Sequence, residues 1–422
     1  MKKLLVVALL VAGFALQADA VRAESVTTIS TFAGDSAIVL DASGNPVIAY
    51  RDAFTTRLEI LHCNDPICAP GGDTVNSPDL QPGQWPSILL DASGNPVVSY
   101  YTTVFDRLKL LHCNDPNCAS GGDTLAMPDP GSFLLESQTS LALDASGNPV
   151  IAYAPPYEIR VLHCNDPLCT GNDETITSND SSAAGPSLAL DPSGRPVVAY
   201  FKGSGGVFST GSLRVMHCDD VNCAPGGDTI TAPEPGPGIM PSVRLDASGM
   251  PVLAYYTGTS TRDLRVMHCN DVNCSGTNES ISTPDAVGDV GGDPALVLDG
   301  GLPVVTYRDE TNGDLKLLRC NDVNCGPGGD TRTSLDTAAD SGKRSSLLID
   351  GAGNPAITFD AGTDLHLIRC DTPACASAVG GIARLPGVPP PASGSASFPL
   401  FVFAALALAA LTSIAFVRRR RA

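Results

Sequence analysis

Short apolar runs recur along this chain, and each is bounded by turn residues. Between Pro86 and Leu125, for example, the runs PSILL, PVVSYY and LKLLHC are separated by segments rich in Gly, Asp and Asn. Runs of about five to seven apolar residues between such segments are typical of β-strands and hairpins. Outside the two ends of the chain, no window has the period of about 3.6 residues expected of an amphipathic helix. The pattern therefore predicts an all-β protein.

One block of about 50 residues occurs seven times between residues 24 and 386. Each copy contains four strand candidates, which resemble PSLALD, PVVAYY, LKLLHC and a short DTITT in that order. Four consecutive antiparallel strands form one blade of a β-propeller, and a fixed repeat of this length is typical of that architecture. The sequence thus predicts a seven-bladed propeller of four-stranded antiparallel blades.

The turn between the first two strands of a unit reads DASGN at Asp41–Asn45 and recurs with small variations. Its Gly supplies the left-handed residue that the turn needs, and its Asp side chain can accept hydrogen bonds from the turn's own amides. Pro46 then begins the second strand, where a missing N–H is tolerated.

The last blade lacks a fourth strand within its own repeat, and both ends of the propeller segment offer one. The candidates are SVTTIST at Ser25–Thr31 and GGIARLP at Gly380–Pro386. The N-terminal segment matches the other fourth strands better. We therefore expect Ser25–Thr31 to complete blade seven and to close the ring.

All 14 cysteines fall into seven C-x4-C pairs. An even number at a fixed local spacing in an exported chain favours disulfides, and the intervening NDPN or NDVN turn would bring each pair within bonding distance. A loop of about six residues is worth about 2 kcal/mol in the chain-entropy model. The predicted pairs are Cys63 with Cys68, Cys113 with Cys118, Cys164 with Cys169, Cys218 with Cys223, Cys269 with Cys274, Cys320 with Cys325, and Cys370 with Cys375.

A histidine precedes the first cysteine in five units, which raises a metal site as the alternative. Neighbouring residues on a strand point to opposite faces, so one unit cannot easily direct both side chains at one ion. Two units carry Arg319 and Arg369 at this position instead. We therefore expect no metal or other cofactor, and assign these side chains to the space between blades, with their polar ends meeting water or a carboxylate. The single carboxylate of DASGN is too sparse for a dedicated calcium site.

The two ends of the chain have the composition of export and anchoring segments. Residues 1–23 resemble a signal peptide, with two lysines, an apolar run and small residues before the cleavage site. Residues 387–397 form a Pro/Gly/Ser linker, residues 398–417 are long enough for a transmembrane helix, and the arginines of residues 418–422 predict a cytoplasmic tail. The propeller is then exported and held outside the membrane. LPGVP at Leu385–Pro389 lacks the LPxTG pattern of a sortase substrate, so permanent anchoring is favoured over processing.

The formal net charge of −19 excludes one class of partner. Because the two ends are net positive, the propeller segment is more acidic still. Such a surface repels nucleic acid, so we expect no nucleic-acid partner.

The repeats resemble those of bacterial extracellular propellers, which read roughly PSIALDSNGNPHISYYD followed by LKYA and are loosely related to the Asp-box repeats of sialidase-like folds. The resemblance covers the first three strands of all seven units, from about Ala37 to Cys370. It fails from the end of the third strand, where HCNDPxC replaces an aromatic-rich segment. It implies a surface-exposed propeller and no single activity.

The two faces of the predicted propeller differ in how much they vary. One face carries the near-identical DASGN and CNDPxC turns, whereas the connections on the other differ between units. Variable loops on a rigid scaffold usually carry recognition, so we place a ligand on the variable face and name Trp85, Phe201 and Phe208 as candidate contacts. The aromatic residue that ends each second strand, Tyr50 in the first unit, is expected to pack between blades, with carbohydrate stacking as the alternative.

These observations favour a cell-surface binding or adhesion module whose partner is an unknown protein or carbohydrate. A structural component of the cell envelope is one alternative. A glycan-processing hydrolase is another, and it would need two carboxylates at a defined separation. Most Asp residues here belong to repeated turns, and no GxSxG or HExxH motif is present. The sequence therefore predicts no catalytic residue.

Overall fold

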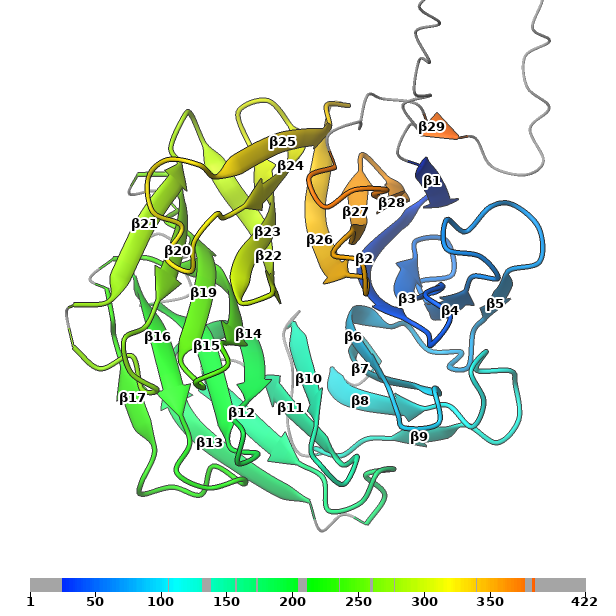
Figure 1. Ribbon diagram of the computed structural model, residues 1–422. Helices are drawn as coiled ribbons and strands as arrows, with labels where there is room; N and C mark the ends of the chain where they lie inside the picture. The colour runs from blue at the N-terminus through cyan, green and yellow to red at the C-terminus, as the bar shows by residue number, and fades with distance from the viewer. Residues whose placement is uncertain are drawn as a thin grey trace, which may run out of the picture. The chain divides into compact units, whose positions relative to one another are not determined.

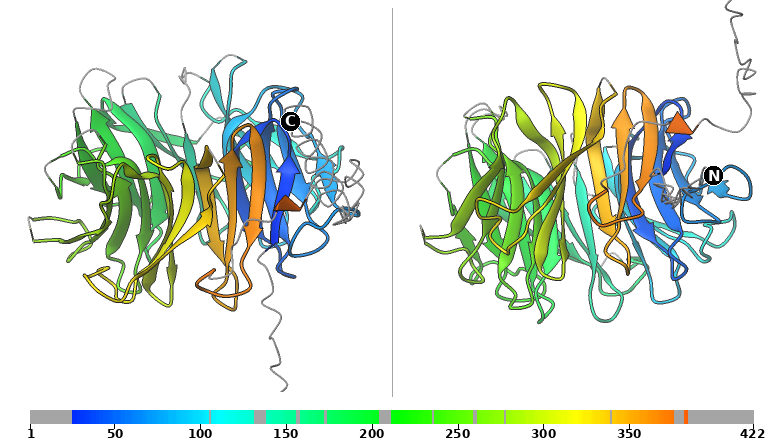
Figure 2. Two further views of the ribbon diagram at one scale, coloured as in Figure 1. Left: turned by 90° about the horizontal axis from the view of Figure 1, so that it is seen from above. Right: turned by 45° about the horizontal axis from the view of Figure 1, so that its top comes forward.

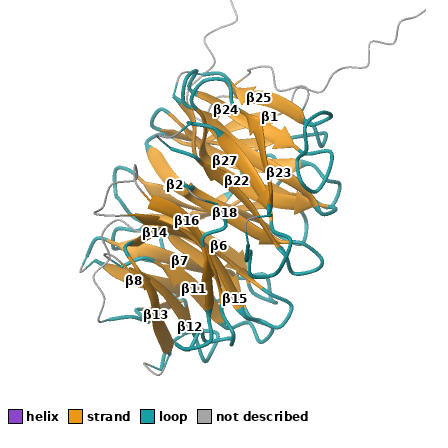
Figure 3. Cartoon of the chain, turned by 90° about the vertical axis from the view of Figure 1, so that its left-hand side faces the viewer, coloured by secondary structure: helices purple, strands orange, loops and turns teal. Residues whose placement is uncertain are grey.

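The computed structural model describes residues 25–375 and 382–383, apart from short gaps at 105, 131–137, 156–157, 172–173, 204–210, 235, 259–260, 277 and 339. The predicted signal peptide, linker, transmembrane helix and tail lie outside the described residues. Within those residues, no helix is long and apolar enough to cross a membrane. Figure 3 shows strands joined by loops throughout the described part of the chain.

Seven antiparallel sheets form a ring, as predicted (Figure 1). The first strands are β2 (Ala33–Leu40), β6 (Gln84–Leu90), β10 (Thr139–Leu143), β14 (Ala183–Leu190), β18 (Ile239–Leu245), β22 (Val290–Asp299) and β26 (Ser341–Ile349). The second strands are β3 (Pro46–Asp52), β7 (Pro96–Thr102), β11 (Pro149–Tyr153), β15 (Pro196–Gly203), β19 (Pro251–Tyr256), β23 (Leu302–Asp309) and β27 (Pro355–Ala361). The third strands are β4 (Leu58–His62), β8 (Arg107–His112), β12 (Glu158–His163), β16 (Gly211–His217), β20 (Leu264–His268), β24 (Asp314–Arg319) and β28 (Asp364–Arg369). The fourth strands are β5 (Thr74–Asn76), β9 (Thr124–Ala126), β13 (Thr175–Ser181), β17 (Thr229–Thr231), β21 (Ser280–Asp285) and β25 (Thr331–Asp336), with β1 (Ser25–Ser30) serving blade seven.

The first strands surround the central channel. Each contacts the first strand of the next blade, in the order β2, β6, β10, β14, β18, β22, β26 and back to β2. In the views of Figure 2 the blades stand side by side, with their strands running through the thickness of the ring. All the first strands consequently begin on the same face, at one mouth of the channel.

The N-terminal strand closes the ring, which confirms the prediction. β1 pairs with β28 in antiparallel fashion, from Ser25 opposite Arg369 to Ser30 opposite Leu365. Val26 is buried in the same cluster as Leu335 of blade six and Leu347 of blade seven. The competing C-terminal candidate is present as well, because β29 (Ile382–Ala383) adds a fifth, parallel strand outside β1.

The repeated turn has the predicted geometry. Gly44 is left-handed with φ at 84°, and one carboxylate oxygen of Asp41 accepts hydrogen bonds from the amides of Ser43 and Asn45, both at 2.8 Å. The same contacts recur at the turn of blade two, where Asp91 caps the amides of Ser93 and Asn95. The sequence motif therefore encodes a rigid hairpin once per blade.

All 14 cysteines form the seven predicted disulfides, and none is free. The second cysteine of every pair is left-handed, with φ between 46° and 53°. A non-glycine residue in this region costs roughly 1–2 kcal/mol, and the Asp of the loop opposes that cost by accepting amide hydrogen bonds, as Asp65 does from Ile67 and Ala69. Seven disulfides are typical of a protein outside the reducing cytosol.

In six of the seven units, the residue before the disulfide contacts the next blade. His62 Nε2 lies 3.1 Å from Asp41 Oδ2 of its own blade, and its Nδ1 lies 2.8 Å from Asn117 Oδ1 of the next blade. His163, His217 and His268 bind the equivalent pair of residues. The expected position between blades is thus what the structure shows.

The aromatic residues that end the second strands are core residues. All but Tyr50 are 0% exposed, and Tyr50 is 4% exposed. Tyr100, for example, packs with Leu58 and Ile60 of the preceding blade, and its hydroxyl donates to Asp79 at 2.6 Å. This burial supports packing between blades and leaves no surface for the stacking of a sugar.

Replacing Val26 by Asp tests the closure of the ring. A buried carboxylate at this position removes apolar contacts with blades six and seven, so the free energy of unfolding should fall by about 3 kcal/mol. Val75 lies on the fourth strand of blade one and is 50% exposed, which makes Val75→Asp the matched control, with an expected change of about 0.5 kcal/mol or less. Urea unfolding measures both, and equal effects of the two substitutions would contradict the assigned role of β1.

The disulfides are tested by the double substitution Cys113→Ala and Cys118→Ala. Loss of one six-residue loop should lower the free energy of unfolding by about 2 kcal/mol under oxidising conditions. With a reductant present, the variant and the parent protein should unfold at closer urea concentrations. An unchanged midpoint under oxidising conditions would show that the bond adds no stability.

Candidate functional site

Six of the seven first strands contain a β-bulge close to the channel mouth. At each bulge one residue is left-handed: Asp35 at φ 52°, Trp85 at 52°, Gly185 at 61°, Met240 at 52°, Asp293 at 47° and Arg344 at 49°. Bulges reorient single side chains and are frequent beside functional sites. Gln138 occupies the corresponding place just before β10. We call these seven residues the mouth ring.

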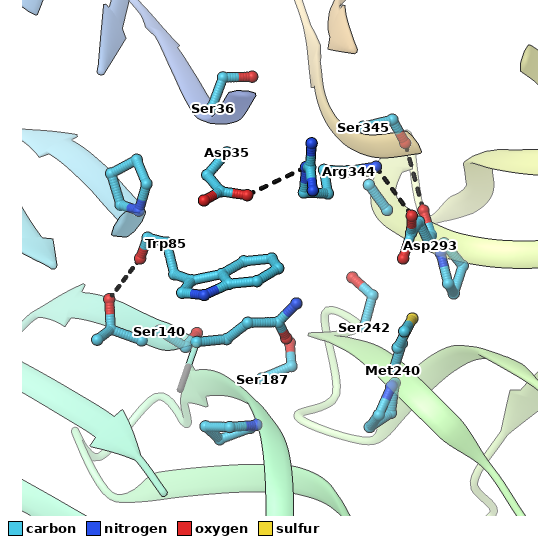
Figure 4. A pocket seen from close by; sticks show the side chains of 17 residues that line it. Asp35, Ser36, Trp85, Ser140, Ser187, Met240, Ser242, Asp293, Arg344 and Ser345 are labelled. Atoms are coloured by element: carbon cyan, nitrogen blue, oxygen red, sulfur yellow. Dashed lines mark hydrogen bonds and ion pairs between the residues drawn. The ribbon is translucent and has the colours of Figure 1, made fainter. Parts of the chain in front are cut away.

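Six residues of the mouth ring, all but Gly185, line a pocket of 230 Å³ (Figure 4). Every blade contributes, because the pocket wall also includes the residues that follow each ring position, such as Ser140, Ser187 and Ser242. Pockets for drug-sized ligands measure about 300–1,000 Å³. This one is suited to a single ring-sized chemical group.

Charge is distributed unevenly around the mouth ring. Asp293 of blade six, Arg344 of blade seven and Asp35 of blade one carry charges, whereas Gln138, Gly185 and Met240 of blades three to five carry none. Trp85 stands between the two sides, and the Arg344 guanidinium lies 5.9 Å from the centroid of its ring. At this distance the cation and the indole face attract each other.

Arg344 is held by carboxylates from three strands. Its Nε donates to Asp360 Oδ2 of β27 at 2.6 Å and lies 3.0 Å from Asp35 Oδ1 of β2. Its backbone amide donates to Asp293 Oδ2 of β22 at 2.9 Å. These contacts connect blades six, seven and one, and they hold the guanidinium at the edge of the pocket.

Burial alters the acidity of this cluster. It raises the pKa of Asp360, which is 0% exposed, to about 7, although Arg344 acts in the opposite direction. Burial also raises the pKa of Asp35 and Asp293, again against the effect of nearby guanidinium groups. Desolvation lowers the pKa of Arg344 less than Asp360 and Asp35 raise it, so its net shift is upward.

A set of serines stabilises the wall below the mouth ring. Ser140 Oγ accepts the Leu188 amide of the next blade at 2.9 Å, and Ser187 Oγ accepts the Val243 amide at 3.0 Å. Ser87, Ser242 and Ser346 act in the same way. The innermost strands would otherwise present unpaired amides to the channel, so these hydroxyls give the pocket a fixed wall.

The three predicted ligand contacts differ in their surroundings. Trp85 lies in the mouth pocket, on the face predicted from loop variation. Phe201 is only 2% exposed, and its ring lies against Gly203 and Gly211 of its own hairpin, so it presents almost no surface to a ligand. Phe208 lies outside the described residues. Of the three positions, the structure therefore places Trp85 in a pocket.

Sequence reasoning missed the charged half of the mouth ring. The repeated PSLAL-like segment of each first strand is directly preceded by one ring residue. This residue is Asp35, Asp293 or Arg344 in the charged blades and Trp85 in blade two. A usable signal was present, because this position carries Asp, Trp, Gln, Gly, Met, Asp and Arg in the seven repeats, whereas the position after it is Pro, Ser or Thr in every repeat. The partner Asp360 comes from another strand and could not be inferred from spacing.

One group of metal-binding side chains occurs in the described residues, namely Cys164, Cys169 and Glu174. Both cysteines belong to a disulfide, so their sulfur atoms are not thiolate ligands. The group does not amount to a metal site.

No protein-family model matches the chain, and no curated protein matches it. Solved structures do resemble it. A protein of unknown function from Dyadobacter fermentans DSM 18053 has a TM-score of 0.50 at 11% identity, covering 82% of this chain and 97% of that one. The Hadza microbial sialidase Hz136 has a TM-score of 0.46 at 13% identity, covering 78% and 74%. The α-L-arabinanase of Penicillium chrysogenum, complexed with arabinobiose, has a TM-score of 0.46 at 13% identity, covering 68% and 93%. At such identities the likeness is one of fold alone.

Protonation of Asp360 should make stability depend on pH between about 4 and 7. Its pKa is raised in the folded state, so the folded protein binds more protons than the unfolded chain in this range and loses stability as the pH rises. Urea unfolding should therefore show higher stability at pH 5 than at pH 8. Asp360→Asn should reduce that difference, and a variant with the full pH dependence would exclude Asp360 as its origin.

Proposed function

We propose that this protein is a non-catalytic binding module of the cell surface, and that its ligand is a carbohydrate held at the channel mouth. The mouth ring carries this proposal. The seven first strands enter the pocket with residues that differ in charge, size and aromatic character, and variation at one concave site of a repeated scaffold favours recognition there.

The chemistry of the pocket suits a sugar. Trp85 offers an indole whose electron-rich face attracts the C–H groups on one side of a sugar ring. Arg344, Asp293 and Gln138 provide groups that donate or accept hydrogen bonds at the rim. A small volume with one aromatic surface and several polar groups fits a single sugar unit of a glycan better than an apolar ligand.

The buried position of Asp360 favours binding over hydrolysis. A glycosidase needs two carboxyl groups that reach the bond to be cleaved. Asp360 is 0% exposed, so a substrate cannot touch it, and its contact with Arg344 accounts for its place in the cluster. Asp35 and Asp293, the carboxylates that line the pocket, are bound by the guanidinium and by the backbone amide of Arg344 respectively, so these contacts account for their places as well.

Trp85→Ala is the central test, with the full-length exported protein applied to a glycan array and then to titration calorimetry with each glycan that binds. Loss of the indole surface should weaken binding at least about tenfold, which corresponds to about 1.4 kcal/mol. Phe54, an aromatic residue 74% exposed and outside the mouth pocket, provides the control Phe54→Ala. Binding that survives Trp85→Ala but not Phe54→Ala would place the ligand elsewhere, and a parent protein that binds no glycan would refute the proposal.

A further inference from the structure

Negative charge exceeds positive charge at the channel mouth. Asp35 and Asp293 line the pocket, and Arg344 is the one basic residue among those that line it. The guanidinium is already paired with Asp360 and Asp35. A ligand entering the pocket therefore meets a field that is net negative.

On the charged side of the pocket, one donor and one acceptor remain open. Arg344 donates from Nε and Nη2 to Asp360, whereas its Nη1 has no hydrogen-bond partner among the described residues, and the side chain is 37% exposed. Asp293 accepts the Arg344 amide with Oδ2, and its Oδ1 accepts no hydrogen bond from those residues. Figure 4 shows both side chains at the rim of the same pocket as Trp85.

One buried carboxylate oxygen in the pocket wall also lacks a hydrogen bond. Asp35 is 8% exposed, and its Oδ1 has an ion pair but no hydrogen-bond donor, because the nearby Arg344 N–H is directed at Asp360. Charge that is buried and incompletely compensated exerts a stronger field than charge in water, since it is poorly screened. A second anion brought beside Asp35 would be disfavoured for that reason.

We infer that the mouth pocket selects an uncharged sugar residue with neighbouring hydroxyls and discriminates against the corresponding acidic sugar. One hydroxyl would accept from Arg344 Nη1 and its neighbour would donate to Asp293 Oδ1, while the ring lies against Trp85. A carboxylate on the sugar can accept from Arg344 but cannot donate to Asp293, and it adds a negative charge beside Asp35. Discrimination of this kind arises from repulsion as much as from attraction. The inference rests on the proposed carbohydrate-binding function.

The test compares matched pairs of oligosaccharides that end in a neutral hexose or in its uronate, with gluco, galacto and manno forms. Calorimetry on the full-length protein at pH 7.5 should give a Kd at least about tenfold lower for the preferred neutral form than for its uronate. Asp293→Asn should narrow that ratio several-fold, because it removes the charge and keeps a side chain of the same size. Asp371→Asn, in an exposed loop on the opposite face, is the charge-matched control and should leave the ratio unchanged.

The outcomes separate this inference from the function on which it rests. Equal or tighter binding of a uronate that is lost in Trp85→Ala would overturn the charge selectivity and leave the carbohydrate site standing. Binding of neither sugar form would overturn both. Asp35→Asn repeats the test on a second carboxylate if Asp293→Asn has an altered urea midpoint, and an unchanged ratio in a folded Asp35→Asn protein would also overturn the selectivity.

Discussion

The pairing of β1 with β28 is the interaction on which the rest of this structure depends. Every hydrophobic cluster lies between two blades, so a blade is stable only when it has a neighbour on both sides. The N-terminal strand gives blade seven its fourth strand, and Val26 fills the core that blades six and seven share. Closure then leaves the seven first strands around one channel. Their bulges consequently meet at one level, and a single pocket forms there.

Variation in the repeats is coupled between neighbouring blades. His62 binds Asn117 of the following blade, and three further histidines bind the asparagine at the same place. Blade three has Leu168 at the position of this asparagine, and His112 of blade two contacts the Pro167 carbonyl instead. Arg319 and Arg369 precede the two blades that carry Ala374 and Ile67 at that place. Arg319 donates to the Gly353 carbonyl of the next blade instead, whereas Arg369 pairs with Asp350 of its own blade. The wall serines vary as well. Blades one and six have Ala37 and Ala295 at the serine position, so there the hydrogen bond from the amide of the next blade is lost.

The sequence was sufficient to predict the ring because its signals are local. The cysteine spacing and the DASGN turn specify contacts within a few residues and recur along the chain. The N-terminal strand pairs with the distant β28, but its sequence resembles the fourth strands of the other blades. The candidate site was harder to predict from the sequence, because Arg344 is held by Asp35 and Asp293, which are distant in sequence and come from other blades. Trp85 was recognised as the sole tryptophan of a variable loop. Phe201 was chosen because it begins a long variable loop, but its ring folds back against Gly211 and is buried. The length of a loop does not reveal such a contact.

The departures from the repeat gather on the charged side of the pocket. Blades six, seven and one contain Asp293, Arg344 and Asp35, and they also contain Ala37 and Ala295 in place of serine, Arg319 and Arg369 in place of histidine, and Phe359 in place of tyrosine. A buried charge requires partners from several strands, whereas the repeat supplies only its own standard contacts. Blades two to five carry uncharged ring residues and keep the serine, histidine and tyrosine of the repeat. The regular blades therefore supply the rigid frame, and the divergent blades supply the electrostatics of the mouth.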